Sequence, residues 1–351
     1  MKRKKRGAAW FIRLRVCVQT FFVLLFVWLF LRTVFQVGGA SARGVDLFFD
    51  LDPLALVSVW LSGHPVRTGM LLALIWVAVT FVFGRWFCGW FCPFGALHNL
   101  FGSWRSGNRK SKIAAGQFSR WQHAKYLWLF AVLVSSLVGA NLAGWLDPFS
   151  YLFRSLTMAV FPAVDGGVEH LFAWVYRHDV GIGSLHVTTV SEPVYRWVHY
   201  NLLSVSQPRY FWSLMFGLLF AVIMGLNFFR ARFWCKYICP LGALLGVFGK
   251  NPLLRLQVDK AGCTDCGICV SECQGAADPH HRGGQWKPSE CMYCLNCQDS
   301  CPSDVIRFRF VVPSEAIGVA AKQPLVAAKE PLVKIAPAEA RDHDHEEAEH
   351  E

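Results

Sequence analysis

Two runs of four cysteines carry the clearest chemical signal in this sequence. The first run consists of Cys263, Cys266, Cys269 and Cys273. The second run consists of Cys291, Cys294, Cys297 and Cys301. Both runs have the spacing C-x2-C-x2-C-x3-C, and Pro302 follows the second. This pattern is typical of proteins that bind two [4Fe–4S] clusters and transfer electrons one at a time.

The two runs predict which cysteines share a cluster. In two-cluster proteins of this type, the fourth cysteine of each run binds the other cluster. One predicted ligand set is therefore Cys263, Cys266, Cys269 and Cys301. The other predicted ligand set is Cys291, Cys294, Cys297 and Cys273. Zinc and disulfides are the alternatives, but two complete runs favour clusters, and a cytoplasmic domain keeps its thiols reduced.

A second set of cysteines lies in an internal duplication. Residues 85–97 and 232–244 are similar in sequence, and each segment contains a C-x3-C-P motif. The cysteines of the two motifs are Cys88, Cys92, Cys235 and Cys239. If the duplication produces pseudo-symmetry, these thiols converge and suit an additional iron–sulfur centre, a soft metal such as Cu(I), or two redox-active dithiols. Buried, inert cysteine is the alternative.

The helix pattern around these motifs has two possible forms. If a helix runs through each motif, the two sulfurs lie on one face, since residues four apart are neighbours. The proline that follows each motif, Pro93 or Pro240, then interrupts the helix or restarts it. Both forms place the thiols at the end of a helix.

Apolar segments predict a membrane domain that positions the cysteines. The chain has 351 residues, of which 54% are hydrophobic, more than is usual in soluble proteins. Four stretches approach the ~20 apolar residues that cross a bilayer. They cover residues 16–35, 68–87, 126–146 and 211–229. The predicted fold is membrane α-helical, with four transmembrane helices in two duplicated hairpins and a C-terminal bacterial-type two-[4Fe–4S] ferredoxin domain.

The predicted domains follow from these features. They are a basic cytoplasmic N-terminus over residues 1–15, the membrane domain over 16–250, the ferredoxin domain over 251–312 and a disordered tail over 313–351. The tail is acidic and contains His343, His345 and His350. It cannot bury enough apolar surface to fold alone, although its histidines could bind a metal weakly.

A Leu-Asp-Pro sequence is also duplicated. Asp52-Pro53 and Asp147-Pro148 each follow an apolar stretch. Aspartate is a good helix N-cap and proline a good first helical residue. We therefore expect short helices over residues 53–61 and 148–161 at the outer membrane interface, with an ordinary turn as the alternative.

The basic residues predict the orientation in the membrane. The net charge is +11, and lysine and arginine gather before the first stretch, in the loop 102–125 and after the fourth stretch. By the positive-inside rule, both termini and this loop are cytoplasmic. Because the charge flanks apolar segments, we expect membrane topology signals and no nucleic-acid partner.

Three features together resemble the NosR/NapH-type membrane-bound polyferredoxins over roughly residues 16–310. They are the four apolar stretches, the paired C-x3-C-P motifs and the C-terminal double cysteine run. The resemblance implies a multi-pass inner-membrane protein that exchanges electrons between the quinone pool and a partner redox protein, such as a cytochrome, ferredoxin or reductase. It also implies an electron-transfer subunit of a quinol-linked oxidoreductase complex. The layout is closer to NapH, and only 15 residues precede the first stretch, so we expect no flavin. The first cysteine run departs from the family pattern, because glutamine and not proline follows Cys273.

Two other functions compete with this interpretation. The four membrane cysteines could bind or reduce copper, or assemble a metal centre, as in a related polyferredoxin branch. A docking scaffold with structural clusters is the third possibility. Direct NAD(P)H oxidation is not expected, because no G-x-G-x-x-G sequence follows a predicted strand.

Overall fold

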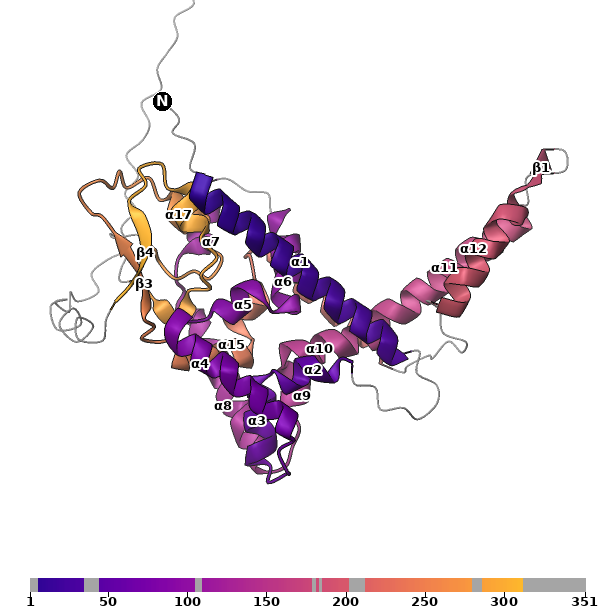
Figure 1. Cartoon of the computed structure of the whole chain (residues 1–351), viewed down its shortest axis with the longest axis horizontal. Helices are drawn as coiled ribbons and strands as arrows, with labels where there is room; N and C mark the ends of the chain where they lie inside the picture. The colour runs from indigo at the N-terminus through magenta and orange to yellow at the C-terminus, as the bar shows by residue number, and fades with distance from the viewer. Residues whose placement is uncertain are drawn as a thin grey trace, which may run out of the picture. The chain divides into compact units, whose positions relative to one another are not determined.

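Helices build most of the chain before residue 250 (Figure 1). The computed structural model describes residues 6–34, 44–104, 109–178, 181–182, 185–201, 212–279 and 286–311. All of them belong to one unit, which spans Met1–Val312. The predicted tail over residues 313–351, with His343, His345 and His350, lies outside the described residues, as do residues 1–5.

The helical part combines long helices with short ones. In chain order they are α1 (Arg6–Val34), α2 (Asp46–Asp50), α3 (Pro53–Leu61), η1 (Thr68–Leu72), α4 (Ala73–Phe83), α5 (Trp86–Trp90), α6 (Pro93–Ser103), α7 (Arg109–Gly116), η2 (Arg120–His123), α8 (Ala124–Leu137), α9 (Ala143–Leu146), α10 (Pro148–Ser155), η3 (Leu156–Val160), α11 (Phe161–Arg177), α12 (Val187–Asn201), α13 (Ser213–Gly225), η4 (Leu226–Phe228), α14 (Phe233–Tyr237) and α15 (Pro240–Phe248). A two-stranded pair, β1 (Gly181–Ile182) and β2 (Leu185–His186), separates α11 from α12.

Each predicted membrane stretch contains a helix, but three helices are shorter than predicted. Among the described residues, one helix, Trp10–Thr33, is long and apolar enough to cross a membrane. The apolar helices Thr68–Phe83 and Ser213–Phe228 are shorter, and α8 ends at Leu137. At the N-terminus α1 already begins at Arg6, so most of the predicted basic N-terminus over residues 1–15 is helix.

Two glycines account for the early helix ends. Gly84 follows α4 with a φ of 62°, and Gly139 follows α8 with a φ of 75°. Glycine adopts this left-handed conformation without the steric cost of a Cβ, and it ends helices there. At Gly84 a Cβ would also collide with the ring of Tyr293. The predicted stretches 68–87 and 126–146 were too long because hydropathy does not register these turns.

The helices of the four predicted stretches expose apolar side chains. The large exposed residues on α1, α4, α8 and α13 include Phe21, Leu24, Leu74, Ile75, Leu127, Phe130, Leu214 and Leu218. We expect such exposed apolar side chains on four helices to contact lipid or protein.

The duplicated Leu-Asp-Pro sequences start helices as predicted. Asp52 caps α3 by accepting a 2.8 Å hydrogen bond from the Leu54 amide. Asp147 caps α10 by accepting a 2.9 Å hydrogen bond from the Phe149 amide. Leu54 and Phe149 are fully buried, so the starts of both helices pack inside the unit. Their location at the outer membrane interface stays a prediction.

The C-terminal part is small and has one sheet. Strand β3 (Leu254–Val258) pairs antiparallel with β4 (Ile306–Phe310), with Leu254 opposite Phe310. Between the strands lie α16 (Ile268–Ser271), η5 (Pro288–Glu290) and α17 (Asn296–Ser300). Its core includes three cysteines together with Val270 and Ile306.

His98 and Asn227 join the two copies of the duplication. His98 on α6 is fully buried, and its Nδ1 lies 2.8 Å from Oδ1 of Asn227 in η4. Asn227 Oδ1 also accepts a hydrogen bond from the Phe233 amide, 3.3 Å away. Burial lowers the pKa of His98 from 6.5 to about 4, so the folded protein holds its ring neutral.

This burial predicts a loss of stability in acid. The unfolded chain binds a proton at His98 near pH 6.5 and the folded chain only near pH 4, so stability is complete above pH 6.5 and falls as the pH drops toward 4. His98→Gln keeps an amide donor for Asn227 but cannot gain charge. We expect the pH dependence of the melting temperature in detergent to be smaller in this variant between pH 7 and 5. An unchanged dependence would show that His98 is not the group responsible.

Candidate metal centres

The structure arranges the eight ferredoxin cysteines around two cavities. The first cavity is lined by Cys263, Cys266, Cys269 and Cys301. The second cavity is lined by Cys273, Cys291, Cys294 and Cys297. Pro279 lines both, so the cavities are neighbours. Each cavity thus brings together three cysteines of one run and the fourth cysteine of the other, in the two sets that the spacing predicts.

A repeated backbone conformation bends each run around its cavity. In the first run Asp265 and Gly267 have φ values of 53° and 69°. At the equivalent positions of the second run, Tyr293 and Leu295 have φ values of 50° and 62°. Residues other than glycine adopt this left-handed conformation at a cost of about 1–2 kcal/mol each. The repetition of this cost in both runs indicates that the curvature is needed to turn the thiols inward.

The donor chemistry fits an iron–sulfur cluster in each cavity. Four thiols face each space, and thiolates are the usual ligands of [4Fe–4S] clusters. Burial raises the pKa of Cys273 to about 11 and that of Cys269 to about 12, with neighbouring thiols adding to both shifts. These two thiols are therefore protonated at neutral pH without metal, and cluster loading must release their protons. No three His, Cys, Asp or Glu side chains among the described residues are arranged to hold a single metal ion.

The C-x3-C-P motifs restart a helix at the second cysteine. Cys88 lies in α5, which ends at Trp90, and Cys92 is the N-cap of α6. Its Sγ accepts a 3.4 Å hydrogen bond from the Gly95 amide. In the second copy Cys239 caps α15 in the same way, with Sγ 3.2 Å from the Gly242 amide. The alternative in which one helix runs through both cysteines is therefore wrong, because the proline begins a new helix.

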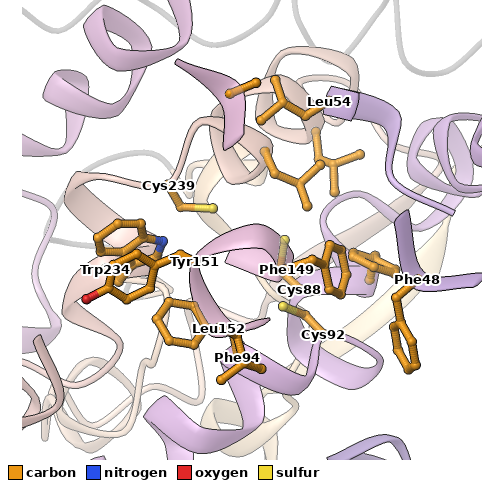
Figure 2. Close-up of a cluster of buried hydrophobic side chains, with 14 of the residues drawn as sticks. Phe48, Leu54, Cys88, Cys92, Phe94, Phe149, Tyr151, Leu152, Trp234 and Cys239 are labelled. Carbon is orange, nitrogen blue, oxygen red and sulfur yellow. The ribbon is translucent and has the colours of Figure 1, made fainter. Parts of the chain in front are cut away.

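The four motif cysteines converge inside the helical unit. All four are buried, and each of Cys92 and Cys239 is within electrostatic reach of Cys88 and Cys235. Figure 2 shows Cys88, Cys92 and Cys239 in one cluster of buried side chains, with Phe149 beside Cys88. We call Cys88, Cys92, Cys235 and Cys239 the cysteine quartet.

Two buried arginines cross between the copies at the quartet. Arg232 of the second copy donates from Nη1 to the carbonyl of Cys88, at 2.8 Å. Arg85 of the first copy donates from Nη2 to the carbonyl of Cys235, at 3.4 Å. Both arginines are fully buried, and buried charge is costly unless it is paired. The two guanidinium groups therefore favour negative charge at the quartet. Arg85 and Arg232 begin the duplicated segments 85–97 and 232–244, but the repeat alone gives no indication of these contacts.

The second cysteine run packs directly against the first C-x3-C-P motif. A Cβ at Gly89 would collide with the carbonyl oxygen of Met292, so glycine is needed for this approach. The Trp90 indole donates a 3.1 Å hydrogen bond to the Tyr293 carbonyl. Arg15 of α1 donates a 2.7 Å hydrogen bond to the Cys294 carbonyl. Two helices, α5 and α1, thus hold one loop of the ferredoxin part.

A buried ionic cluster fixes the same loop. Glu290 accepts from Arg85 Nη1 at 3.3 Å and also from the ammonium group of Lys125. All three side chains are almost completely buried. Arg85 Nη1 also donates to the Ser289 carbonyl, at 3.1 Å. This cluster connects the end of α4, the start of α8 and the residue before Cys291.

Comparison with protein families identifies both cysteine regions. Residues 68–112 and 211–258, which contain one C-x3-C-P motif each, match the family described as 4Fe-4S binding domain. Residues 255–302 match the 4Fe-4S dicluster domain.

Several curated proteins are similar over most of this chain. An uncharacterised protein of Methanocaldococcus jannaschii is 22% identical over 79% of this chain and 84% of its own length. The ferredoxin-type protein NapH of Escherichia coli is 25% identical over 74% of this chain and 76% of its own length. The regulatory protein NosR of Pseudomonas aeruginosa is 25% identical over 73% of this chain but only 32% of its own length. No solved structure matches this chain.

The contact at Gly89 predicts a specific effect of one methyl group. Gly89→Ala places a Cβ against the Met292 carbonyl and should displace the loop that carries Cys291 and Cys294. We expect loss of visible absorbance and of EPR signal from the cluster bound there. Gly102→Ala is the matched control, because its Cβ would lie an ordinary 3.5 Å from that of Ala231. Equal cluster content in both variants would contradict the proposed contact.

The ionic cluster predicts a large cost for losing its carboxylate. Glu290→Gln leaves Arg85 and Lys125 buried without a counter-charge, which typically costs about 3–5 kcal/mol. Chemical unfolding in detergent measures this cost. Glu192→Gln is the control, because Glu192 pairs with Arg196 at the surface and such pairs contribute about 0–1 kcal/mol. A similar small effect of both substitutions would contradict the buried cluster.

Proposed function

Because the chain belongs to the NosR/NapH-type family of membrane-associated 4Fe–4S ferredoxin proteins, we propose that it relays electrons between the quinone pool and a partner redox protein. A [4Fe–4S] cluster accepts and releases one electron at a time. The ligands proposed for one cluster are Cys263, Cys266, Cys269 and Cys301. The ligands proposed for the other are Cys273, Cys291, Cys294 and Cys297.

One side chain carries this proposal, because it touches both cysteine sites. Arg232 donates from Nη1 to the Cys88 carbonyl at 2.8 Å and approaches the sulfur of Met292 at 3.3 Å. Met292 lies between two cysteines of the second run and is buried. Arg232 therefore contacts both the backbone of the quartet and a residue that lines the second cavity. Such proximity supports a continuous path from the membrane part to the ferredoxin part.

The quartet is the proposed entry point of this path. Four converging thiols beside two buried guanidinium groups suit a negatively charged iron–sulfur centre. The match of both C-x3-C-P regions to a 4Fe-4S binding family supports the same chemistry. Two redox-active dithiols are the other form that this arrangement permits.

The first cavity is the proposed exit. Each cavity has two half-buried and two buried cysteines, but only the second is lined by Met292, which contacts Arg232 at the quartet. The first cavity therefore comes last on a path that begins at the quartet, and a partner would exchange electrons there. We propose that this side faces the cytoplasm, because α1 brings its basic N-terminal end, through Arg15, to the ferredoxin part.

Membrane integration is proposed for all four apolar stretches. α1 is long enough to cross alone, and the shorter helices expose apolar side chains.

Quinol-dependent reduction tests the proposed function. The purified protein is placed in liposomes with a reduced quinol, and the cluster absorbance is followed. We expect the cluster absorbance to decrease when quinol is added. After chemical reduction of the clusters, we expect the absorbance to recover when quinone is added. If neither quinol nor quinone changes the absorbance, the quinone-linked relay is wrong.

Iron content tests the number of centres. We expect ~8 irons per chain if two [4Fe–4S] clusters bind, and ~12 if the quartet holds a third. If the quartet holds a third cluster, Cys88→Ser should lower the iron content from ~12 to ~8 per chain. The signals of the ferredoxin clusters should stay unchanged. A count unaffected by this substitution would favour dithiols at the quartet.

Copper reduction is the competing function that the quartet also favours, because buried thiols bind Cu(I) well. It predicts that Cys239→Ser abolishes Cu(II) reduction while quinol still reduces both ferredoxin clusters. Loss of quinol reduction with copper reduction intact would exclude it.

A further inference from the structure

The duplicated aspartates meet inside the helical unit. Asp52 begins α3 in the first copy, and Asp147 begins α10 in the second. Their exposed fractions are 0% and 3%. Neither aspartate is needed by the electron path described above.

Each aspartate uses one carboxyl oxygen to cap its helix and leaves the other uncapped. Asp52 Oδ1 binds the Leu54 amide, and Asp147 Oδ2 binds the amides of Phe149 and Ser150. The remaining atoms, Asp52 Oδ2 and Asp147 Oδ1, are buried and have no ordinary donor. The two carboxyl groups instead lie within hydrogen-bonding reach of each other.

A hydrogen bond between two carboxyl groups requires a proton. Ionised carboxylates are acceptors only, so one of the two must be protonated for the bond to form. Burial raises the pKa of Asp52 well above its usual range, and the nearby charge of Asp147 adds to this. Burial also raises the pKa of Asp147. Two buried carboxyl groups in contact share protons as a pair.

The surroundings of the pair connect it to the cysteine quartet. The titratable groups on α10 and on the helices packed against α3 and α10, their N-caps included, are Asp46, Asp50, Arg67, Cys92, His98, His123, Lys125, Tyr126, Tyr151, Arg154 and Cys239. Lys125 binds Glu290, Arg154 lies over the Trp145 ring, and Asp46 pairs with Arg67. Cys92, by contrast, is close enough for the charge of Asp147 to act on its thiol.

We infer that Asp52 and Asp147 form a proton-sharing carboxyl pair that exchanges protons for the redox chemistry of the cysteine quartet. The pair carries one proton and one negative charge at rest. Its exchange step rests on the proposed quinol-linked function. When quinol becomes quinone it releases two electrons and two protons. Iron–sulfur centres held by the cysteines would take up the two electrons, one electron each. One proton binds the pair, which becomes neutral, and the other passes to water.

Infrared spectroscopy tests the pair without any turnover. Asparagine caps helices as well as aspartate does, so Asp52→Asn and Asp147→Asn keep the caps. In either variant the asparagine amide can donate to the remaining carboxylate, which no longer needs a proton. The wild-type protein should show the carbonyl band of a buried protonated carboxyl group, shifted in D₂O, and both variants should lose it.

Control variants keep this experiment interpretable. Asp46→Asn, at a partly exposed surface pair, should retain the band. If a single variant does not fold, the double variant Asp52→Asn/Asp147→Asn keeps both caps without any buried charge, and the band should be absent. A wild-type protein without the band, or a band that persists in the double variant, would overturn the pair.

Quinol kinetics test the role of the pair. In liposomes, quinol should reduce the clusters of the asparagine variants about 100-fold more slowly than those of the wild type. This factor is the smallest that the loss of a positioned proton acceptor typically causes. Reduction by dithionite, which releases no proton at the site, should keep its rate. Equal quinol rates in variant and wild type would overturn the exchange role. If quinol does not reduce even the wild-type protein, the quinone function fails, and the infrared band still decides whether the pair exists.

Discussion

The packing of residues 289–293 against the first C-x3-C-P motif is the constraint on which the rest of the structure depends. The loop enters beside Gly89, and the polar groups of its backbone bind side chains that come from other helices. Arg85 holds the Ser289 carbonyl, Trp90 holds the Tyr293 carbonyl, and Glu290 carries the charge that balances Arg85 and Lys125. Buried backbone carbonyls need such partners. The loop therefore fixes the ferredoxin part, and the second cysteine cavity with it, beside the quartet.

The two copies of the duplication have diverged around this contact. The residue after the first motif cysteine is Gly89 in one copy and Lys236 in the other. Gly89 admits the second cysteine run, whereas Lys236 donates to the Ala115 carbonyl on α7 at 3.3 Å. The next residue on α7, Gly116, lies against the carbonyl of Val270, beside Cys269. The two copies are thus similar in their cysteines and in the arginine by which each contacts the other copy. They differ in the part of the ferredoxin that each one contacts.

The spacing of residues in the sequence predicted the chemistry of this protein well, but it predicted the three-dimensional geometry less well. The grouping of eight cysteines into two sets, and the aspartate caps at Asp52 and Asp147, follow from local rules that the structure reproduces. The helix ends at Gly84 and Gly139 were missed, since hydropathy averages over a single turn residue. Arg85 and Arg232 begin the two duplicated segments, but their partners lie 150 and 144 residues away, and no local pattern reveals such contacts. The meeting of the two aspartates also required the three-dimensional arrangement of both copies.

Rapid-freeze EPR on quinol addition tests the central claim most directly, namely that electrons enter the ferredoxin part through the quartet. The wild-type protein and Cys88→Ser are each mixed with quinol in liposomes, after both are shown to contain the two ferredoxin clusters. The account predicts that the signal of the reduced ferredoxin clusters develops in the wild type and is lost, or slowed by orders of magnitude, in Cys88→Ser, while dithionite reduces both proteins equally. Equal rates with quinol would show that electrons reach the ferredoxin part without the quartet.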